Sequence, residues 1–287
     1  MKVTMECLGC SLNQTLNECR MCGASEEQTE LAMDRMMKVI QDYREFRNPP
    51  LIAEKIHEIA YEITGVQDPF LPAKKKDMDT AWKLRPAVEK AIRHSSDPLL
   101  MALKASAIGN TLDSALVANP DLENTIAAEL DQHFFTPAYE SFREDLDKAG
   151  SFLLIGDNAG ESVFDAVLLS MLPKGIKKYY AARSIPVIND VTLSEALDSG
   201  IEHFAQIIES GSHAPGTPVF KCTDEFQKLF SEADIVFSKG QGNYETLDEE
   251  NRRIYFLFKS KCSVIAAKSG SPIGTYVLTM SDPRFPL

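Results

Sequence analysis

Hydrophobic positions in the first half of the chain recur at helical spacing. Leu31, Met36 and Ile40 fall on one face of a helix, and Pro49-Pro50 interrupts that run. Similar patterns cover residues 51–63, 79–94, 97–108, 121–134 and 137–148. We therefore expect residues 26–150 to be helical, with the methionine and aromatic side chains of these faces packed in a core.

The pattern changes at Gly150. The run Ser151–Ile155 is short and almost wholly apolar, which is typical of a buried parallel strand. Further strand-like runs cover residues 178–182, 186–188, 204–208, 234–237, 254–258, 263–267 and 275–278, and helical patterns cover 161–172, 193–197 and 224–230. This alternation predicts an α/β domain with a mainly parallel sheet at 151–287, preceded by a helical domain at 1–150.

Polar residues follow three of the predicted strands. Asp157 and Asn158 come after the first, Asn189-Asp190 after the run 186–188, and the segment Ser238–Glu245 after the run 234–237. Ligands of open α/β sheets bind beyond the carboxyl ends of the strands, so we expect these side chains to lie near one another. Each cluster is weak evidence by itself, because Asp-Asn after a strand is also common in helix caps and turns.

The chemistry of these residues suits a metal ion and a phosphate. Two carboxylates and an amide oxygen, from Asp157, Asp190 and Asn158, are hard ligands for Mg²⁺ or Mn²⁺. Lys239 lies in a glycine-rich loop before a predicted helix, which suits a phosphate. Neither G-x-x-x-x-G-K-[ST] nor G-x-G-x-x-G follows the first strand, which disfavours a P-loop nucleoside triphosphatase and a dinucleotide-dependent dehydrogenase. The sequence thus predicts metal-assisted phosphoryl chemistry.

The net charge of the chain limits the kinds of molecule that it can bind. The 287 residues include 30 Lys+Arg and 42 Asp+Glu, a formal net charge of −12. Nucleic acids and anionic membranes are held by clustered cations, and only Lys74-Lys75-Lys76 forms such a run. No secretory leader or membrane-spanning run is evident, so we expect a cytoplasmic protein without membrane or nucleic-acid partners. A bound cation would supply the positive field that an anionic substrate needs.

Four cysteines form two pairs near the amino terminus, Cys7-x-x-Cys10 and Cys19-x-x-Cys22. Paired CxxC units can hold a structural Zn²⁺ in a reducing compartment. The eight residues between the pairs are fewer than the roughly 15–20 of the usual four-cysteine pattern. A zinc site and a role as buried or occasionally oxidised thiols both remain open.

The ordered set of motifs resembles a known family. Residues 156–161 (GDNAGE) with Phe164-Asp165, then Asn189-Asp190, then 239–245 (KGQGNYE), are similar to those of the metal-dependent damage-control phosphatases. The CxxC pairs and the element at 108–113 (IGNTLD) resemble the prokaryotic branch of that family. The similarity covers nearly the whole chain.

The resemblance implies a phosphatase that acts on small phosphorylated metabolites such as sugar phosphates, nucleotides or damaged phospho-metabolites. It implies Mn²⁺, Mg²⁺, Co²⁺ or Ni²⁺ at the residues matching Asp157, Asn158 and Asp190, and Lys239 against the substrate phosphate. It further implies a substrate pocket formed by Asn110, Asp113, Glu161, Asn243 and Glu245. Whether Asp157 is a metal ligand or a nucleophile stays open. The alternative is a non-catalytic metal- or nucleotide-binding protein with a zinc-held interaction module.

Overall fold

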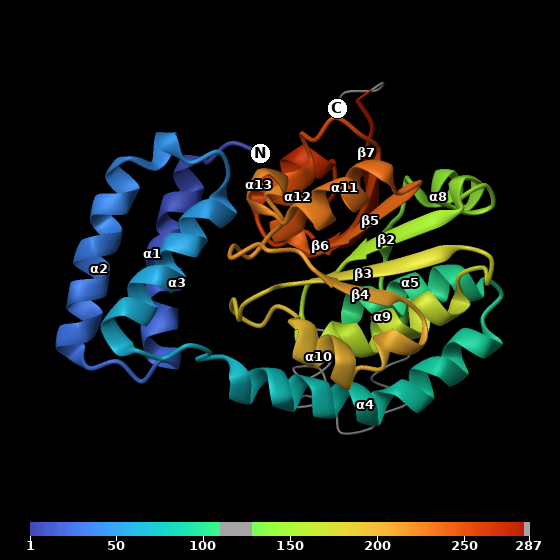
Figure 1. The fold of residues 1–287 in the computed structure, drawn as a ribbon, viewed down its shortest axis with the longest axis horizontal. Coiled ribbons are helices and arrows are strands. Elements are labelled where there is room, and N and C mark those ends of the chain that lie inside the picture. Colours follow the sequence, from blue (N-terminus) through green and yellow to red (C-terminus); the bar gives the residue numbers. More distant parts are fainter. Residues whose placement is uncertain (110–127, 284–287) are drawn as a thin grey trace.

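The computed structural model describes residues 1–109 and 128–283. Its first helices, α1 (Met5–Met21), α2 (Glu26–Gln41) and α3 (Pro49–Thr64), form a bundle beside the rest of the chain (Figure 1). Met36, Ile52 and Ile56 lie in the buried core of this bundle. Ser25 and Gln28 form a reciprocal capping box that starts α2, and the Pro49-Pro50 pair occupies the first turn of α3, where a missing N–H costs nothing.

The strands that the structure describes form one sheet of seven, in the order β1-β7-β6-β5-β2-β3-β4. Their bounds are β1 Phe134–Phe135, β2 Ser151–Ile155, β3 Lys177–Ala182, β4 Gln206–Glu209, β5 Ile235–Lys239, β6 Ile254–Lys259 and β7 Tyr276–Ser281. All neighbouring strands are parallel except β6 and β7. The predicted α/β class with a mainly parallel sheet is confirmed.

Helices cover both faces of the sheet (Figure 1). On one face, α4 (Leu71–His94), α5 (Pro98–Ile108), α8 (Tyr139–Leu146) and α9 (Ala159–Met171) share a core with inward side chains such as Leu154 and Phe237. On the other face, α11 (Asp224–Glu232), α12 (Gln241–Leu247) and α13 (Ser263–Ser269) pack with Leu153 and Val236. The helix α10 (Leu193–Asp198) and the 3₁₀ turns Tyr43–Glu45, Ile201–His203 and Val219–Lys221 complete the described elements.

The packing divides the chain at a different place from the predicted boundary at residue 150. Helices α4, α5 and α8 belong to the core of the sheet, and β1 is one of its strands. Among the described helices, α1–α3 have a core of their own, apart from the two cores that flank the sheet. Helical periodicity identified these elements, but it does not say which surface an apolar face packs against.

Three local predictions were wrong. Residues 263–267 form α13 and not a strand, because a short apolar run does not distinguish the two structures. Residues 186–188 form a loop, and Ile188 has a positive φ of 46°. Phe134, the last residue of the expected helix at 121–134, instead forms the strand β1 together with Phe135. The cysteine-containing segment, which we did not assign, is the helix α1.

The order in which successive strands are added to the sheet reverses between β2 and β5. From β2 the chain continues through β3 and β4 toward one edge, whereas β5, β6 and β7 lie on the other side of β2. Such a switch point leaves a crevice at the carboxyl ends of β2 and β5. Among the described helices, none is long and apolar enough to span a bilayer.

Candidate active site

The loop after β2 brings two of the predicted metal ligands to the switch point. Gly156 turns the chain in a space that a side chain would not fit, since a Cβ there would lie 2.4 Å from the Tyr180 hydroxyl. Asp157 and Asn158 follow, and Asn158 is the N-cap residue of α9. Thus the tight turn aims both polar side chains into the crevice beyond the sheet.

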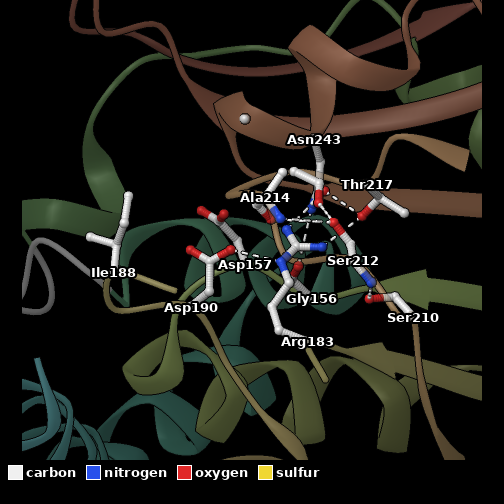
Figure 2. Close-up of polar contacts among 12 residues, drawn as sticks. Gly156, Asp157, Arg183, Ile188, Asp190, Ser210, Ser212, Ala214, Thr217 and Asn243 are labelled. Carbon is white, nitrogen blue, oxygen red and sulfur yellow. Dashed lines mark hydrogen bonds and ion pairs between the residues drawn. The ribbon is translucent and has the colours of Figure 1, made fainter. Parts of the chain in front are cut away.

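The third predicted ligand comes from the loop between β3 and α10. The amide of Val191 donates to the carbonyl of Asp157 at 2.7 Å, and the amide of Ala159 donates to the carbonyl of Asn189 at 2.9 Å. These bonds fasten the segment that carries Asp190 against the loop after β2. Figure 2 shows the carboxylates of Asp157 and Asp190 side by side. Asp157, Asn158 and Asp190 therefore lie together, although they come from separate loops.

Arg183 lies at the centre of the site, and the sequence analysis missed it. This side chain is 1% exposed. Its Nε donates to Asp190 Oδ2 at 2.8 Å, and its terminal nitrogens donate to Thr217 Oγ1 at 2.6 Å and Asn243 Oδ1 at 3.0 Å (Figure 2). Arg183 directly follows a predicted strand, so the strand-end rule applied to the other clusters could have identified it.

Burial and mutual repulsion disfavour the ionised forms of the clustered acids. Burial, together with the nearby Asp190 carboxylate, raises the pKa of Asp157 to about 6. Burial also raises the pKa of Asp190, although the Arg183 guanidinium opposes the shift. In Glu161, burial outweighs the attraction of Lys239 and raises the pKa to about 7. Arg183 and Lys239 therefore offset the cost of burying these carboxylates only in part.

The donor set fits a hard divalent cation. Asp157 and Asp190 supply carboxylate oxygens, and the Asn158 amide contributes a carbonyl oxygen. The Asn158 Nδ2 donates to Asp157 Oδ2 and to Glu161 Oε1, both at 2.8 Å, which fixes the amide next to the carboxylates. A cation among these groups would relieve the repulsion that raises the pKa of Asp157.

Lys239 does not lie where the sequence analysis expected it. Its side chain is completely buried, and its ammonium donates to Glu161 at 2.7 Å, to Asp165 at 2.9 Å and to the carbonyl of Ser106 at 2.9 Å. Burial lowers the pKa of this lysine, but the two carboxylates outweigh it and raise the pKa. All three ammonium hydrogens are used inside the protein, so Lys239 neutralises buried acids and leaves no donor for a phosphate.

A different lysine faces the crevice. A cavity of about 30 Å³ is lined by Asp157, Glu161, Gln241 and Lys261 among others. Lys261 is exposed, and its ammonium forms no ion pair with a partner in residues 1–109 and 128–283. Its backbone amide donates to Gln241 Oε1 at 2.9 Å, which anchors its loop beside α12. Lys261 is thus an available cation at the rim of the acidic cluster.

The structure describes two of the remaining residues that we expected to line the substrate pocket, Asn243 and Glu245. Asn243 is fully buried and donates to the carbonyls of Gly156 and Lys239 at 3.0 and 2.7 Å, so it joins the loops instead of lining a pocket. Glu245 accepts from Gln241 Nε2 at 2.9 Å, and burial raises its pKa to about 7. Asn110 and Asp113 lie outside the described residues.

The four amino-terminal cysteines do not form the compact zinc site that their spacing suggested. Cys7, Cys10 and Cys19 lie along α1, and Cys22 is its C-cap residue. At a rise of about 1.5 Å per residue, Cys7 and Cys19 are roughly 18 Å apart along the helix. No three of these thiols are arranged to hold a metal within the described part of the chain. Cys19 instead packs in the core of the bundle.

A second cavity separates the α1–α3 bundle from the α/β layers. Its volume is about 360 Å³, and its lining includes Glu18 and His57 from the bundle, Ile185 and Pro186 from the loop that carries Asp190, and His213. The bundle therefore contributes side chains to a space next to the candidate site.

Comparison with known proteins agrees with this architecture. A damage-control phosphatase of Pyrococcus horikoshii is 31% identical over 96% of this chain and 97% of its own length. A damage-control phosphatase of Archaeoglobus fulgidus is 26% identical over 96% of this chain and 98% of its own. The crystal structure of a DUF89 family protein from P. horikoshii superposes with a TM-score of 0.88 at 31% identity, covering 98% of this chain and all of that one.

The model of the damage-control phosphatase ARMT1-like domain matches residues 3–277, which include the bundle, the strands β1–β6, the start of β7 and every described residue of the candidate site. The sequence-based resemblance to the damage-control phosphatases is confirmed. On these grounds, the chain belongs to the family of the damage-control phosphatase ARMT1-like domain, which supports a phosphatase role.

Proposed function

We propose that this protein is a divalent-metal-dependent phosphatase that hydrolyses small phosphate esters. The observation that carries the proposal is the convergence of Asp157, Asn158 and Asp190 at the switch point of the sheet. The raised pKa values of the two carboxylates mark a site that a cation would stabilise. Family membership supports the phosphatase role, while the metal and the substrate class are part of the proposal.

In this proposal some side chains bind the metal ion and others hold those ligands in place. A divalent ion at Asp157, Asn158 and Asp190 would polarise a phosphoryl group and lower the pKa of a water. Arg183 holds the Asp190 carboxylate through its Nε. Glu161 and Lys239 form a buried ion pair, and Glu161 also accepts from Asn158, so the pair fixes the amide in place.

We assign the contact with the substrate phosphate to Lys261. Its ammonium is exposed at the crevice that contains Asp157, and its positive charge opposes the burial and the Asp190 charge that raise the pKa of that carboxylate. In the first turn of α9, the amide of Ala159 is not available to a phosphate, because it already donates to the carbonyl of Asn189. A lysine that approaches from solvent can neutralise charge on the phosphoryl oxygens without being withdrawn from a buried pair.

The organic part of the ester would extend toward the cavity of about 360 Å³ between the bundle and the α/β layers. That space accommodates a metabolite rather than a macromolecule. Its lining combines the apolar Ile185 and Pro186 with Glu18, Glu54 and His57. Such a lining suits a small ester with hydroxyl groups.

A phosphatase screen tests the proposal directly. Protein stripped with a chelator is assayed against p-nitrophenyl phosphate, sugar phosphates and nucleotides, with Mn²⁺, Mg²⁺, Co²⁺ or Ni²⁺ added singly. We expect metal-dependent release of phosphate, abolished by Asp157→Asn and unchanged by Asp79→Asn, a substitution of an exposed aspartate on α4. Binding of metal or nucleotide without turnover of any ester would instead support the non-catalytic alternative.

A further inference from the structure

The loop that carries Asp190 contains an unusual backbone conformation. Ile188 has φ = 46°, and no other described residue apart from glycine has a positive φ. The left-handed region is disfavoured for L-residues because Cβ approaches a carbonyl oxygen, and a β-branched side chain makes this worse. The turn closes with a 2.9 Å bond from the amide of Asp190 to the carbonyl of Val187. Something outside the turn must hold Ile188 in this conformation.

The contact that holds it comes from the bundle. The amide of Ile188 donates to Nε2 of His57, on α3, at 2.9 Å. The other ring nitrogen, Nδ1, contacts Oε1 of Glu18 on α1. The Glu18 side chain is 2% exposed and that of His57 is 14% exposed, so water competes weakly for either bond. The three groups form a chain from α1 through α3 to the loop.

The chemistry of the chain determines the tautomer of His57. A backbone N–H can only donate, so Nε2 must be unprotonated to accept from Ile188. Nδ1 therefore carries the proton and donates it to the Glu18 carboxylate. Glu18 thus orients the ring and keeps its acceptor nitrogen directed at the loop.

We propose that Glu18 and His57 are positioning residues that hold the turn Val187–Asp190 so that Asp190 meets Asp157 and Asn158. The carbonyl of Asn189 is fastened from the opposite side by the amide of Ala159. The turn is therefore held between the bundle and the loop after β2. In consequence the α1–α3 bundle sets the geometry of the candidate metal site without contributing a ligand to it. The effect on metal binding rests on the proposed function, whereas the tautomer and the loop geometry do not.

The tautomer is tested on the unmodified protein. Long-range ¹H–¹⁵N correlation spectra of the imidazole rings, assigned with His57→Gln, report which nitrogen is protonated. We expect His57 to be protonated on Nδ1 and the amide of Ile188 to be protected from hydrogen exchange. Protonation on Nε2, or rapid exchange of the Ile188 amide, would overturn the proposal whether or not the protein is a phosphatase.

Variants test the consequence for the site. His57→Leu removes the acceptor, whereas His57→Gln places an amide oxygen near the position of Nε2. For groups that orient metal ligands, losses of 10–100-fold in metal affinity or activity are typical. We expect such a loss of Mn²⁺ affinity, measured by calorimetry, and of kcat in His57→Leu. We expect recovery to within about threefold of the original protein in His57→Gln.

Two further variants separate positioning from other roles. Adding Ile188→Gly to His57→Leu should restore much of the Mn²⁺ affinity, because glycine adopts the positive φ without support. His203→Leu, at an exposed histidine of the Ile201–His203 turn, should change neither quantity. Equal losses in His57→Leu and His57→Gln, with no rescue by Ile188→Gly, would show that His57 acts on the substrate directly and would overturn the proposal. Absence of Mn²⁺ binding in the unmodified protein would refute the proposed function but leave the tautomer test intact.

Discussion

The carboxylate of Asp190 accepts a 2.8 Å hydrogen bond from Nε of Arg183, a pair that lies almost wholly out of contact with solvent. The guanidinium uses its other nitrogens on Thr217, in the loop after β4, and on Asn243, in α12, so one side chain joins three segments of the site. A planar guanidinium makes these bonds in fixed directions, which an ammonium cannot do. Arg183 is therefore a structural centre of the site as well as a counter-charge.

We expect Arg183→Lys to keep the charge but lose this geometry. Breaking a buried pair of this kind costs on the order of 3–5 kcal/mol, and the retained lysine charge should reduce that loss only in part. Urea unfolding should show the loss of stability, and phosphatase assays should show a fall in kcat. Arg93→Lys, at a side chain that is 65% exposed, is the matched control and should leave both unchanged. Unaltered stability of Arg183→Lys would contradict the structural role.

A second prediction concerns Lys239. Replacing it by methionine keeps the length of the side chain but leaves Glu161 and Asp165 buried without their ammonium partner. Removal of one partner from a buried ionic cluster costs about 3–5 kcal/mol, so the melting temperature should fall strongly. The measurement is thermal unfolding in the presence of a chelator. If stability were unchanged and only KM rose, Lys239 would contact the phosphate after all.

Lys261→Ala should behave in the opposite way. The side chain is exposed, and such substitutions alter stability by less than about 0.5 kcal/mol. If Lys261 meets the phosphate, KM should rise and inhibition by inorganic phosphate should weaken, with the fold intact. Lys228→Ala, at an exposed lysine on α11, is the comparison. Identical kinetics in the two variants would remove Lys261 from the site.

The contrast between these lysines shows what the sequence could and could not predict. The strand-end rule found Asp157 and Asn158, because parallel strands place their carboxyl ends at one edge of the sheet. It found Asp190 for a wrong reason, since residues 186–188 are part of the loop after β3 and not a strand. The same rule correctly predicted that Lys239 lies at the carboxyl end of a strand, but it did not predict that the side chain points away from the crevice. Lys239 is the last residue of β5, and its side chain points into the core between β5 and α9. One residue of register decides the face of a strand. Asp165 belongs to the motif set that carries the family resemblance, but the sequence did not indicate that this carboxylate is buried against the Lys239 ammonium.

The contacts between the α1–α3 bundle and the loop that carries Asp190 could not be predicted from the sequence either. Periodicity identified the helix that contains His57, but the bond from Ile188 joins residues 131 positions apart. Such contacts depend on how two separately packed units meet, which local patterns do not encode. The cysteine spacing misled for a related reason, because the two CxxC pairs lie on one continuous helix and its C-cap, which holds the pairs about 18 Å apart along the axis.

Titration of Glu245 should make the free energy of unfolding depend on pH. Burial raises the pKa of this carboxylate to about 7, so the folded protein binds its proton more tightly than the unfolded chain does. The stabilisation is complete below the unfolded pKa, near 4.5, and is lost as the pH rises toward 7. A tenfold difference in proton affinity between the folded and unfolded states corresponds to about 1.4 kcal/mol, so the loss is on the order of 1–3 kcal/mol.

Glu245→Gln removes that titration and should flatten the decline in unfolding free energy between pH 5 and pH 8, measured in urea with a chelator present. The matched control is Glu202→Gln, at an exposed glutamate that should leave the curve unchanged. A decline as steep in Glu245→Gln as in the original protein would assign the dependence to other groups of the site.

Two constraints act at Gly240, a positive φ and close contact with the Asp157 side chain. Its φ is 83°, and a Cβ at this position would lie 2.0 Å from Cγ of Asp157. Gly270, the C-cap residue of α13, has φ = 65° but open space around it. Gly270→Ala should therefore cost only the conformational strain, about 1–2 kcal/mol, with activity retained. Gly240→Ala carries a larger strain, because ψ is 155° at Gly240 and that region is essentially restricted to glycine, whereas ψ is 21° at Gly270. It also adds the clash, which must displace the Asp157 carboxylate, so we expect a larger loss of stability and, as the effect specific to the clash, a loss of Mn²⁺ affinity measured by calorimetry. Equal behaviour of the two variants would mean that Asp157 can move without consequence, which would argue against a fixed role for its carboxylate.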